Sequence, residues 1–173
     1  AVIPRKGHDV LVGALARIRD LPWRSVVVGC LDREPATARA LERRIARTGL
    51  GTRISLRGAL DDAALAMAYH GADLFVLPSR YEGYGMVFAE ALTHGLPVVA
   101  CRAGAAADTV PADAGILVDI DDELALAEAL RRLLTDEPLR RAMADAAHKY
   151  AAGFPSWRET ARIIAGVLAE ERR

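Results

Sequence analysis

The sequence alternates between short apolar runs and longer stretches with helical spacing, and this alternation leaves few folds open to the chain. The apolar runs are rich in β-branched residues and bounded by Gly or Pro, a pattern typical of strands buried on both faces. Parallel neighbours need helical crossovers, so the pattern predicts an α/β fold with a doubly wound parallel sheet. The predicted strands are Ser25 to Val28, Arg53 to Leu56, Asp73 to Leu77, Pro97 to Ala100 and Gly115 to Val118.

Helical periodicity fills the intervals between the predicted strands. Asp and Gly residues at the ends of these stretches suit helix caps. Three further helical stretches follow the last strand signal, and 173 residues suffice for one domain with a sizeable core. We therefore expect a single domain, residues 1–173, with a helical C-terminal tail. The predicted helices are Asp9 to Arg19, Pro35 to Thr48, Asp61 to His70, Met86 to His94, Asp121 to Leu134, Pro138 to Ala151 and Ser156 to Arg172.

The composition excludes several classes of protein. Hydrophobic residues make up 52% and charged residues 27%, as in globular proteins, and the formal net charge of zero argues against a nucleic-acid partner. No apolar stretch approaches the roughly 20 residues of a transmembrane helix, and no signal-peptide pattern is present, so we expect a cytoplasmic protein. Cys30 and Cys101 end apolar runs and are expected to be buried thiols in a reducing compartment.

The first residues of the sequence form an apolar fragment. Ala1 to Ile3 have the character of a strand, and no initiator Met precedes them. We therefore expect the chain to be part of a larger protein. Apolar surface exposed by the absence of the remainder would also favour a homodimer of this chain on its own.

The segment from Pro78 to Ala100 carries the most information about chemistry. It joins one predicted strand to a helix and then to the next strand, and ligands of open parallel sheets bind where such strand-to-helix loops gather. Gly83 and Gly85 allow a tight turn and a close approach of the backbone to a ligand. The helix that follows presents free amides and the positive end of its dipole. This combination predicts a site for a phosphate or a diphosphate.

Two carboxylates flank the glycine turn. Glu82 precedes it and Glu90 lies in the helix, with seven residues between them. Carboxylates accept hydrogen bonds from hydroxyl pairs, so the two suggest sugars at both ends of a diphosphate, as in a nucleotide sugar. Spacing alone leaves open that Glu82 is a helix cap and Glu90 an exposed helix residue. Lys6, before the first helix, is either a solvated side chain or a cation for phosphate, a role that Arg5 could share.

Several motifs together resemble one known family. The Lys6-Gly7 turn, ADLFVLPS, EGYGMVFAE and HGLPVVA resemble the C-terminal half of family 4 glycosyltransferases of the GT-B fold, and the resemblance covers essentially the whole chain. It implies a Rossmann-like domain, one half of a GT-B fold, that binds a nucleotide-sugar donor, with the N-terminal acceptor-binding domain absent from this chain. It also implies retaining hexosyl transfer from a UDP-, GDP- or ADP-sugar without a metal ion or other cofactor. The isolated chain would then be inactive.

The resemblance also implies a role for individual residues. Glu82 would contact hydroxyls of the donor hexose and is the catalytic candidate, whereas Glu90 would hold the ribose diol. Lys6 would neutralise the diphosphate. The family usually has an Arg a few residues upstream, about where Ala1 stands, so either Arg5 substitutes or diphosphate binding is weaker. The remaining implied contacts are the amides of Gly83, Tyr84, Gly85 and Met86 with the diphosphate, and the loop of Arg57 and Gly58 with the base.

Other interpretations of the sequence stay open. Asp119 and Asp121 form a D-x-D, which binds metal in other glycosyltransferases, but here it ends a strand and opens a helix, which favours a cap. A nucleotide-sugar epimerase of similar fold would need further acid and base groups, and the sequence offers no suitable cluster. A noncatalytic nucleotide-binding domain would keep the fold alone. The sequence selects no donor base, hexose or acceptor.

Overall fold

The strands of the chain are parallel, but they form two sheets. The computed structural model describes residues 1–154 and 157–170. The register places Val26 opposite Ser55, and Val99 opposite both Val76 and Ile116. The α/β fold is as predicted, and the last strand has the predicted bounds. In order across each sheet, the strands are β1 (Ser25–Val27) and β2 (Ile54–Leu56), and β3 (Phe75–Leu77), β4 (Val98–Cys101) and β5 (Gly115–Val118).

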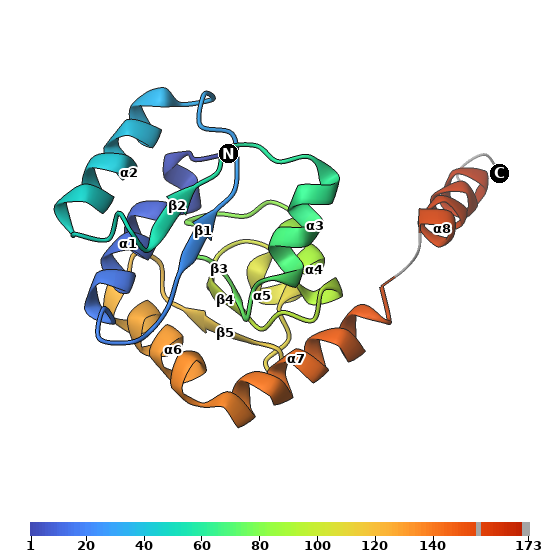
Figure 1. Cartoon of the computed structure of the whole chain (residues 1–173). Coiled ribbons are helices and arrows are strands. Elements are labelled where there is room, and N and C mark those ends of the chain that lie inside the picture. The colour runs from blue at the N-terminus through green and yellow to red at the C-terminus, as the bar shows by residue number, and fades with distance from the viewer. Residues whose placement is uncertain (155–156, 171–173) are drawn as a thin grey trace.

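Helices connect the strands and form the C-terminal part of the chain (Figure 1). Most lie within two residues of their predicted bounds, but η1 and α5 were not predicted because so few residues show no helical period. The predicted ends Ser156 and Arg172 lie outside the described residues. The helices are η1 (Pro4–Lys6), α1 (His8–Arg17), α2 (Pro35–Arg47), α3 (Asp62–His70), α4 (Met86–Thr93), α5 (Ala106–Thr109), α6 (Glu123–Thr135), α7 (Glu137–Ala151) and α8 (Trp157–Glu170).

Strand β4 separates two hydrophobic cores. All four of its residues are buried, as predicted for a strand covered on both faces. Successive side chains point to opposite faces, so Val99 and Cys101 join the core beneath α1, α2 and α6. Val98 and Ala100 join the core beneath α3, α4 and α7. The loop between β3 and α4 is therefore anchored beside packed side chains on both faces.

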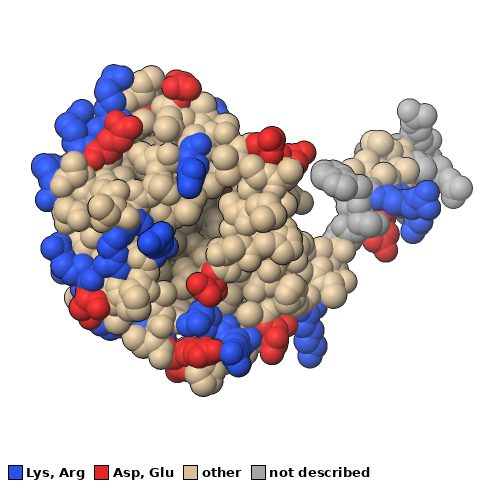
Figure 2. Space-filling model, viewed as in Figure 1, with Lys and Arg blue, Asp and Glu red and all other residues tan. Residues whose placement is uncertain are grey.

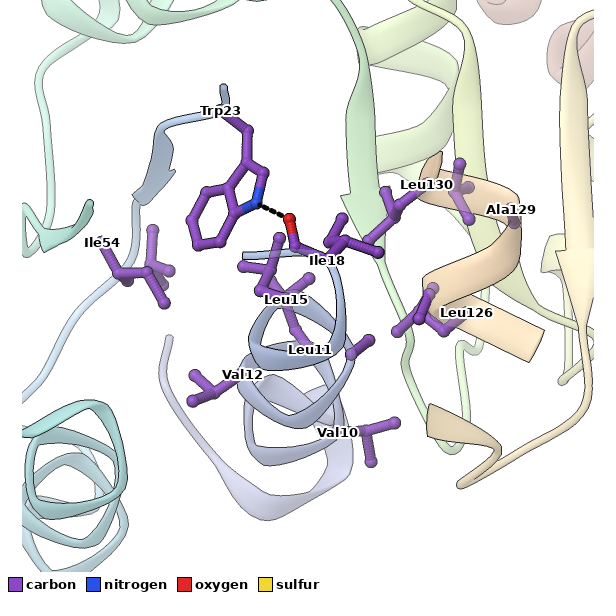
Figure 3. Packing of buried hydrophobic residues seen from close by; sticks show 14 of the residues in the cluster. Val10, Leu11, Val12, Leu15, Ile18, Trp23, Ile54, Leu126, Ala129 and Leu130 are labelled. Carbon is purple, nitrogen blue, oxygen red and sulfur yellow. Dashed lines mark hydrogen bonds between the residues drawn. The ribbon is translucent and has the colours of Figure 1, made fainter. Parts of the chain in front are cut away.

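The first core holds α1 firmly at its C-terminal end. Trp23 lies over this end, and its Nε1 donates a 2.8 Å hydrogen bond to the carbonyl of Ile18. The guanidinium of Arg53 lies 3.8 Å from the centre of the indole ring. Leu126 and Leu130 of α6 pack on another side of α1 (Figure 3). The N-terminus of α1, which borders the β3–α4 loop, therefore extends from a well-packed support.

A hollow separates β1 from β3, and here two sequence predictions are wrong. Ala1–Ile3 form no strand, although the Val2 amide donates a 2.9 Å hydrogen bond to the Cys30 carbonyl. Val26, in the middle of β1, is 54% exposed instead of being buried on both faces. The hollow has a volume of about 1380 Å³ and is visible on the face drawn in Figure 2. In the described residues, neither β1 nor β3 has a neighbouring strand on this side.

Candidate functional site

The glycine turn between β3 and α4 is built as a helix start without a side-chain cap. Gly85 has φ +79°, a left-handed conformation that favours glycine, and a Cβ there would lie 2.7 Å from Thr109 Oγ1. In the described part of the chain, no side chain caps the start of α4, so its leading amides remain free to donate to another group. Gly83 is different, because its φ is not left-handed and its nearest neighbour would lie 4.0 Å from an added Cβ. The conformation of the turn therefore requires Gly85 but not Gly83.

Glu82 is buried beneath this turn and accepts three hydrogen bonds. Its side chain is 9% exposed, and its Oε1 accepts from Lys6 Nζ at 2.5 Å, Ser79 Oγ at 2.8 Å and Arg5 Nη1 at 3.2 Å. Burial alone would raise the pKa of Glu82. The hydrogen bonds from Lys6 and Ser79, with the positive charges of Lys6 and Arg5, instead hold this pKa below its usual value. Glu82 is thus a charged anchor for two cations, not a helix cap.

Lys6 and Arg5 reach Glu82 because η1 delivers them from the start of the chain. Gly7 follows with φ +66°, and a Cβ at this position would lie 2.0 Å from the carbonyl oxygen of Pro78. This close approach places the start of α1 against the end of β3. Gly7 occupies the N-cap position of α1, and in the described part of the chain no side chain caps this helix. A second uncapped helix N-terminus, which sequence reasoning did not identify, therefore borders the same loop as α4.

Arg80 fixes the relative positions of η1, α1 and the loop after β5. Its Nη1 and Nη2 bond both carboxylate oxygens of Asp9, at 3.1 and 2.8 Å, and its Nε bonds Asp121 at 2.7 Å. It also donates to the Pro4 carbonyl at 2.5 Å. The sequence favoured a helix cap from the D-x-D, but this prediction is wrong. The side chain that caps α6 is that of Asp122. Asp121 instead has φ +61° and pairs with Arg80.

Glu90 occupies a different environment from Glu82. It lies exposed on α4, where its Oε2 accepts a 3.1 Å hydrogen bond from the hydroxyl of Tyr69. The Tyr69 ring stacks on His94, with centroids 4.7 Å apart and planes 9° from parallel. Burial, followed by the negative charge of Glu90, raises the pKa of Tyr69, so its hydroxyl keeps the proton that it donates. The stacked ring therefore orients a carboxylate that water can reach.

The hollow beside β1 extends to this site. Its lining includes Lys6, His8, Tyr69 and Glu90. The His8 side chain is buried, and its Nδ1 has no hydrogen-bond partner in the described part of the chain. Burial, then the charges of the N-terminal amine and Lys6, lower the pKa of His8 to about 4, so the ring is neutral near pH 7. Lys6 and Glu90, which the sequence placed at one site, thus face the same space.

The structure brings some of the expected site residues together and leaves others apart. Glu82, Lys6 and Arg5 form one cluster, and Glu90 lines the same hollow as Lys6. Tyr84 and Met86 extend outward from the turn, with 81% and 62% of their surfaces exposed. Arg57 and Gly58 lie in the loop after β2, where the Gly58 carbonyl accepts a 2.7 Å hydrogen bond from Gly29. Among the bonds described for residues 1–154 and 157–170, none joins this pair to Glu82, Lys6 or Glu90.

Sequence reasoning missed three side chains that hold this site in place. Ser79 and Arg80 lie two and three residues after the end of a predicted strand at Leu77, and polar residues at such positions were a usable signal. Tyr69 gave no such signal, because its partner Glu90 lies 21 residues away and one helix further along the chain. Only the packing of α3 beside α4 brings the two together.

Two features are absent from residues 1–154 and 157–170. No three or more His, Cys, Asp or Glu side chains lie together in a way that could hold a metal ion. No helix has both the length and the apolar character needed to cross a bilayer. The groups that the site does offer are open backbone amides, two cations, a buried carboxylate and an exposed one. Such a set suits a ligand with both anionic and hydroxyl groups.

Comparison with protein families gives a match over most of the chain. A family model described as Glycosyl transferases group 1 matches residues 1–136. A D-inositol 3-phosphate glycosyltransferase from Xylanimonas cellulosilytica is 36% identical over 166 residues, which are 95% of this chain and 39% of that relative. A GDP-mannose-dependent monoacylated alpha-(1-6)-phosphatidylinositol monomannoside mannosyltransferase from Corynebacterium glutamicum is 30% identical over 181 residues, covering 99% of this chain and 46% of that protein.

Solved structures give the same result for the fold. Anabaena HepE in complex with UDP and glucose superposes with a TM-score of 0.87 at 29% identity, over 97% of this chain and 46% of that one. Sucrose-phosphate synthase from Thermosynechococcus elongatus gives the same TM-score and identity, over 98% and 43%. The chain spans about two fifths of the length of the first curated relatives.

Proposed function

The chain belongs to the glycosyl transferases group 1 family, and on that premise we propose that it is the donor-binding domain of a retaining glycosyltransferase. The proposed donor is a hexose linked to a nucleoside diphosphate. The full-length protein would transfer this hexose to an acceptor held by a further, N-terminal domain. The observation that carries the proposal is the cluster of Lys6, Arg5 and Glu82 beside the uncapped turn before α4.

The diphosphate is the part of the donor that this cluster would bind. A phosphate at the start of α4 would accept hydrogen bonds from the open amides of Gly83, Tyr84, Gly85 and Met86 and would meet the positive end of the helix dipole. Lys6 and Arg5 are held close by through Glu82. Because these cations and amides can offset the charge that develops on a leaving diphosphate, the proposed reaction uses no metal ion.

Glu90 and Glu82 would contact the two sugars of the donor. Glu90 is exposed and oriented by Tyr69, which suits a carboxylate that accepts hydrogen bonds from the ribose diol. Glu82 bonds its three donors through Oε1, and we propose that Oε2 accepts from a hydroxyl of the hexose. In this arrangement Glu82 both holds Lys6 and contacts the group that is transferred.

The similar proteins indicate which donors to test first. The HepE structures contain UDP, glucose and UDP-glucose, and the mannosyltransferase relative is named as dependent on GDP-mannose. We therefore place UDP and GDP ahead of ADP as ligands. Arg57 and Gly58, in the loop after β2, are the proposed neighbours of the base.

Calorimetric titration of the chain with UDP, GDP and ADP tests donor binding and the role of Glu90 together. We expect heat with at least one of these ligands and about tenfold weaker binding in Glu90→Ala, because a hydrogen bond to a charged acceptor is lost. Glu128, an exposed glutamate on α6, gives the matched control Glu128→Ala, which should bind like wild type. The 2′-deoxy diphosphate should bind wild type weakly and lose little further affinity in Glu90→Ala.

Each result of this titration has a defined meaning. Absence of heat at millimolar ligand would count against donor binding by this chain. Equal affinity for the ribose and 2′-deoxy ligands would remove Glu90 from the ribose contact while leaving diphosphate binding intact. For the full-length protein, the anomeric configuration of the product, followed by NMR with and without a metal chelator, tests retention and metal independence.

A further inference from the structure

Tyr69 of α3 contacts two residues that lie one turn apart at the end of α4. Glu90 and His94, the C-cap residue, are four positions apart, so their side chains lie on the same face of that helix. The Tyr69 hydroxyl donates to Glu90 Oε2 at 3.1 Å, and the Tyr69 ring stacks on His94 with centroids 4.7 Å apart. A single side chain of α3 therefore engages both groups at once.

A series of aromatic rings fixes the position of Tyr69 from the side of the core. Phe88 of α4 is fully buried, and its ring meets that of Phe75 edge-on, with centroids 6.2 Å apart. The Phe75 ring, on β3, lies 6.1 Å from that of Tyr69, which is itself buried. Rings at such separations attract one another beyond the effect of the area that they bury. The Tyr69 hydroxyl is therefore held in one place, whereas Glu90, which accepts from it, is exposed.

The bond from Tyr69 restricts the one torsion that an exposed glutamate leaves free. The terminal torsion of a glutamate is broad, so a carboxylate in water has no preferred plane. A ligand that bonds to both carboxylate oxygens must fix this plane, which costs conformational entropy. Tyr69 occupies one lone pair of Glu90 Oε2, and no other bond to this carboxylate is found in the described part of the chain. Two adjacent hydroxyls of a ligand would therefore meet a carboxylate whose plane is already set.

We propose that Tyr69, held by its stack on His94, is a positioning residue that sets the plane of Glu90 for a vicinal diol. Through it, the chain selects ribonucleotides over nucleotides that lack the diol. This role rests on the proposed function, in which Glu90 accepts hydrogen bonds from the ribose. Tyr69 itself does not contact the nucleotide but acts through Glu90.

A purely structural role of Tyr69 predicts a different result. If the ring only packs α3 against α4, loss of the hydroxyl should leave the binding of every ligand unchanged, and loss of the packing should weaken every ligand equally. A positioning role instead affects only ligands that carry the diol, because a nucleotide without these hydroxyls does not use the plane of Glu90. The choice of ligand therefore separates the two roles.

The test is a calorimetric titration of Tyr69→Phe with two ligands. One is whichever of UDP, GDP and ADP binds wild type most tightly, and the other is its 2′,3′-dideoxy form. We expect Tyr69→Phe to bind the ribose ligand about three- to tenfold more weakly than wild type and the dideoxy ligand equally well. In a Glu90→Ala background, Tyr69→Phe should cause no further loss. The matched control, Tyr150→Phe, removes the hydroxyl of an exposed tyrosine on α7 and should bind both ligands like wild type.

Two variants of His94 test the contribution of the stack. His94→Ala removes the ring on which Tyr69 stacks and should weaken the ribose ligand but not the dideoxy ligand. His94→Phe keeps a stacked ring and should restore most of the affinity. Urea unfolding of each variant confirms that it is folded, and Tyr69→Phe should keep a midpoint near that of wild type because its ring remains.

The possible results separate this proposal from donor binding itself. Wild-type affinity of folded Tyr69→Phe for the ribose ligand, or equal weakening of both ligands, would overturn the role of Tyr69 and leave donor binding in place. No binding of any of the three diphosphates by wild type would overturn the proposed function, and the role of Tyr69 with it.

Discussion

The glycine turn has an inner side and an outer side that differ in nearly every physical respect. On the inner side, Glu82 is buried and takes three hydrogen bonds, and Gly85 packs against Thr109 in a left-handed conformation. On the outer side, Gly83 has an ordinary conformation, and Glu90 is exposed and accepts a hydrogen bond from Tyr69. The two glutamates look equivalent in the sequence, but the structure gives them different tasks.

This difference shows how a site can be both rigid and open. The inner side fixes two cations and the helix start in place, so little reordering is needed when an anion arrives. The outer side leaves a carboxylate accessible to water and therefore to a ligand. Changes on the inner side should therefore affect the stability of the fold, and changes on the outer side should affect binding alone.

The largest expected effect comes from truncating the inner carboxylate. Glu82→Ala leaves Lys6, Arg5 and Ser79 without their shared acceptor, and removing one partner of a buried ion pair costs about 3 kcal/mol. Glu90→Ala is the matched change on the outer side and should cost less than about 1 kcal/mol. Urea unfolding of both variants measures the difference. Equal losses would show that the two sides do not differ as the contacts imply.

A smaller effect is expected from the two glycines. Gly85→Ala forces a left-handed alanine against Thr109 and should destabilise the fold by about 2 kcal/mol. Gly83→Ala meets no atom closer than 4.0 Å and should change stability by less than about 0.5 kcal/mol. Thermal unfolding of the pair provides the measurement. A Gly83 variant as unstable as the Gly85 variant would contradict the inner and outer assignment.

The smallest effect is expected in the pH dependence of stability. The pKa of Glu82 is lowered in the folded chain, so its contribution is present above the usual glutamate pKa of 4.5 and is lost as the pH falls through the lower folded value. Glu82→Gln removes this titration and should flatten the acid limb of the stability curve. Urea midpoints measured from pH 6 to pH 3 test this expectation. An unchanged slope would mean that the Lys6 pair adds no stability to the charged form.

The sequence predicted the strands and most helices of the fold, but it did not predict the hollow between β1 and β3. Buried runs such as Gly115 to Val118 carry a local signal, and this strand was found with its bounds. The rule that strand-to-helix loops meet at one edge of a sheet placed Lys6 near the glycine turn, but it did not predict the bond from Lys6 to Glu82. The separation of β1 from β3 could not be predicted, because residue patterns describe a strand but not the presence of its neighbour.

Contacts between distant residues explain the remaining misses. The residue pattern did not indicate that Arg80 pairs with Asp9 and Asp121. It also did not indicate that Glu82 is buried. Both features depend on how the loops at the edge of the folded sheet lie relative to one another. The D-x-D illustrates the same limit, because local reasoning expected a cap from Asp119 or Asp121 and the neighbouring residue supplies it.

The bonds of Arg80 also have a consequence for the order of folding. They join residues 71 and 41 positions apart, and the Lys6 bond to Glu82 spans 76 positions. Contacts between residues so far apart in the sequence form only after large loops close, which costs conformational entropy, whereas helices form from local contacts. We therefore expect this corner of the molecule to assemble late. During synthesis, it can form only after the ribosome has released residues through Asp121.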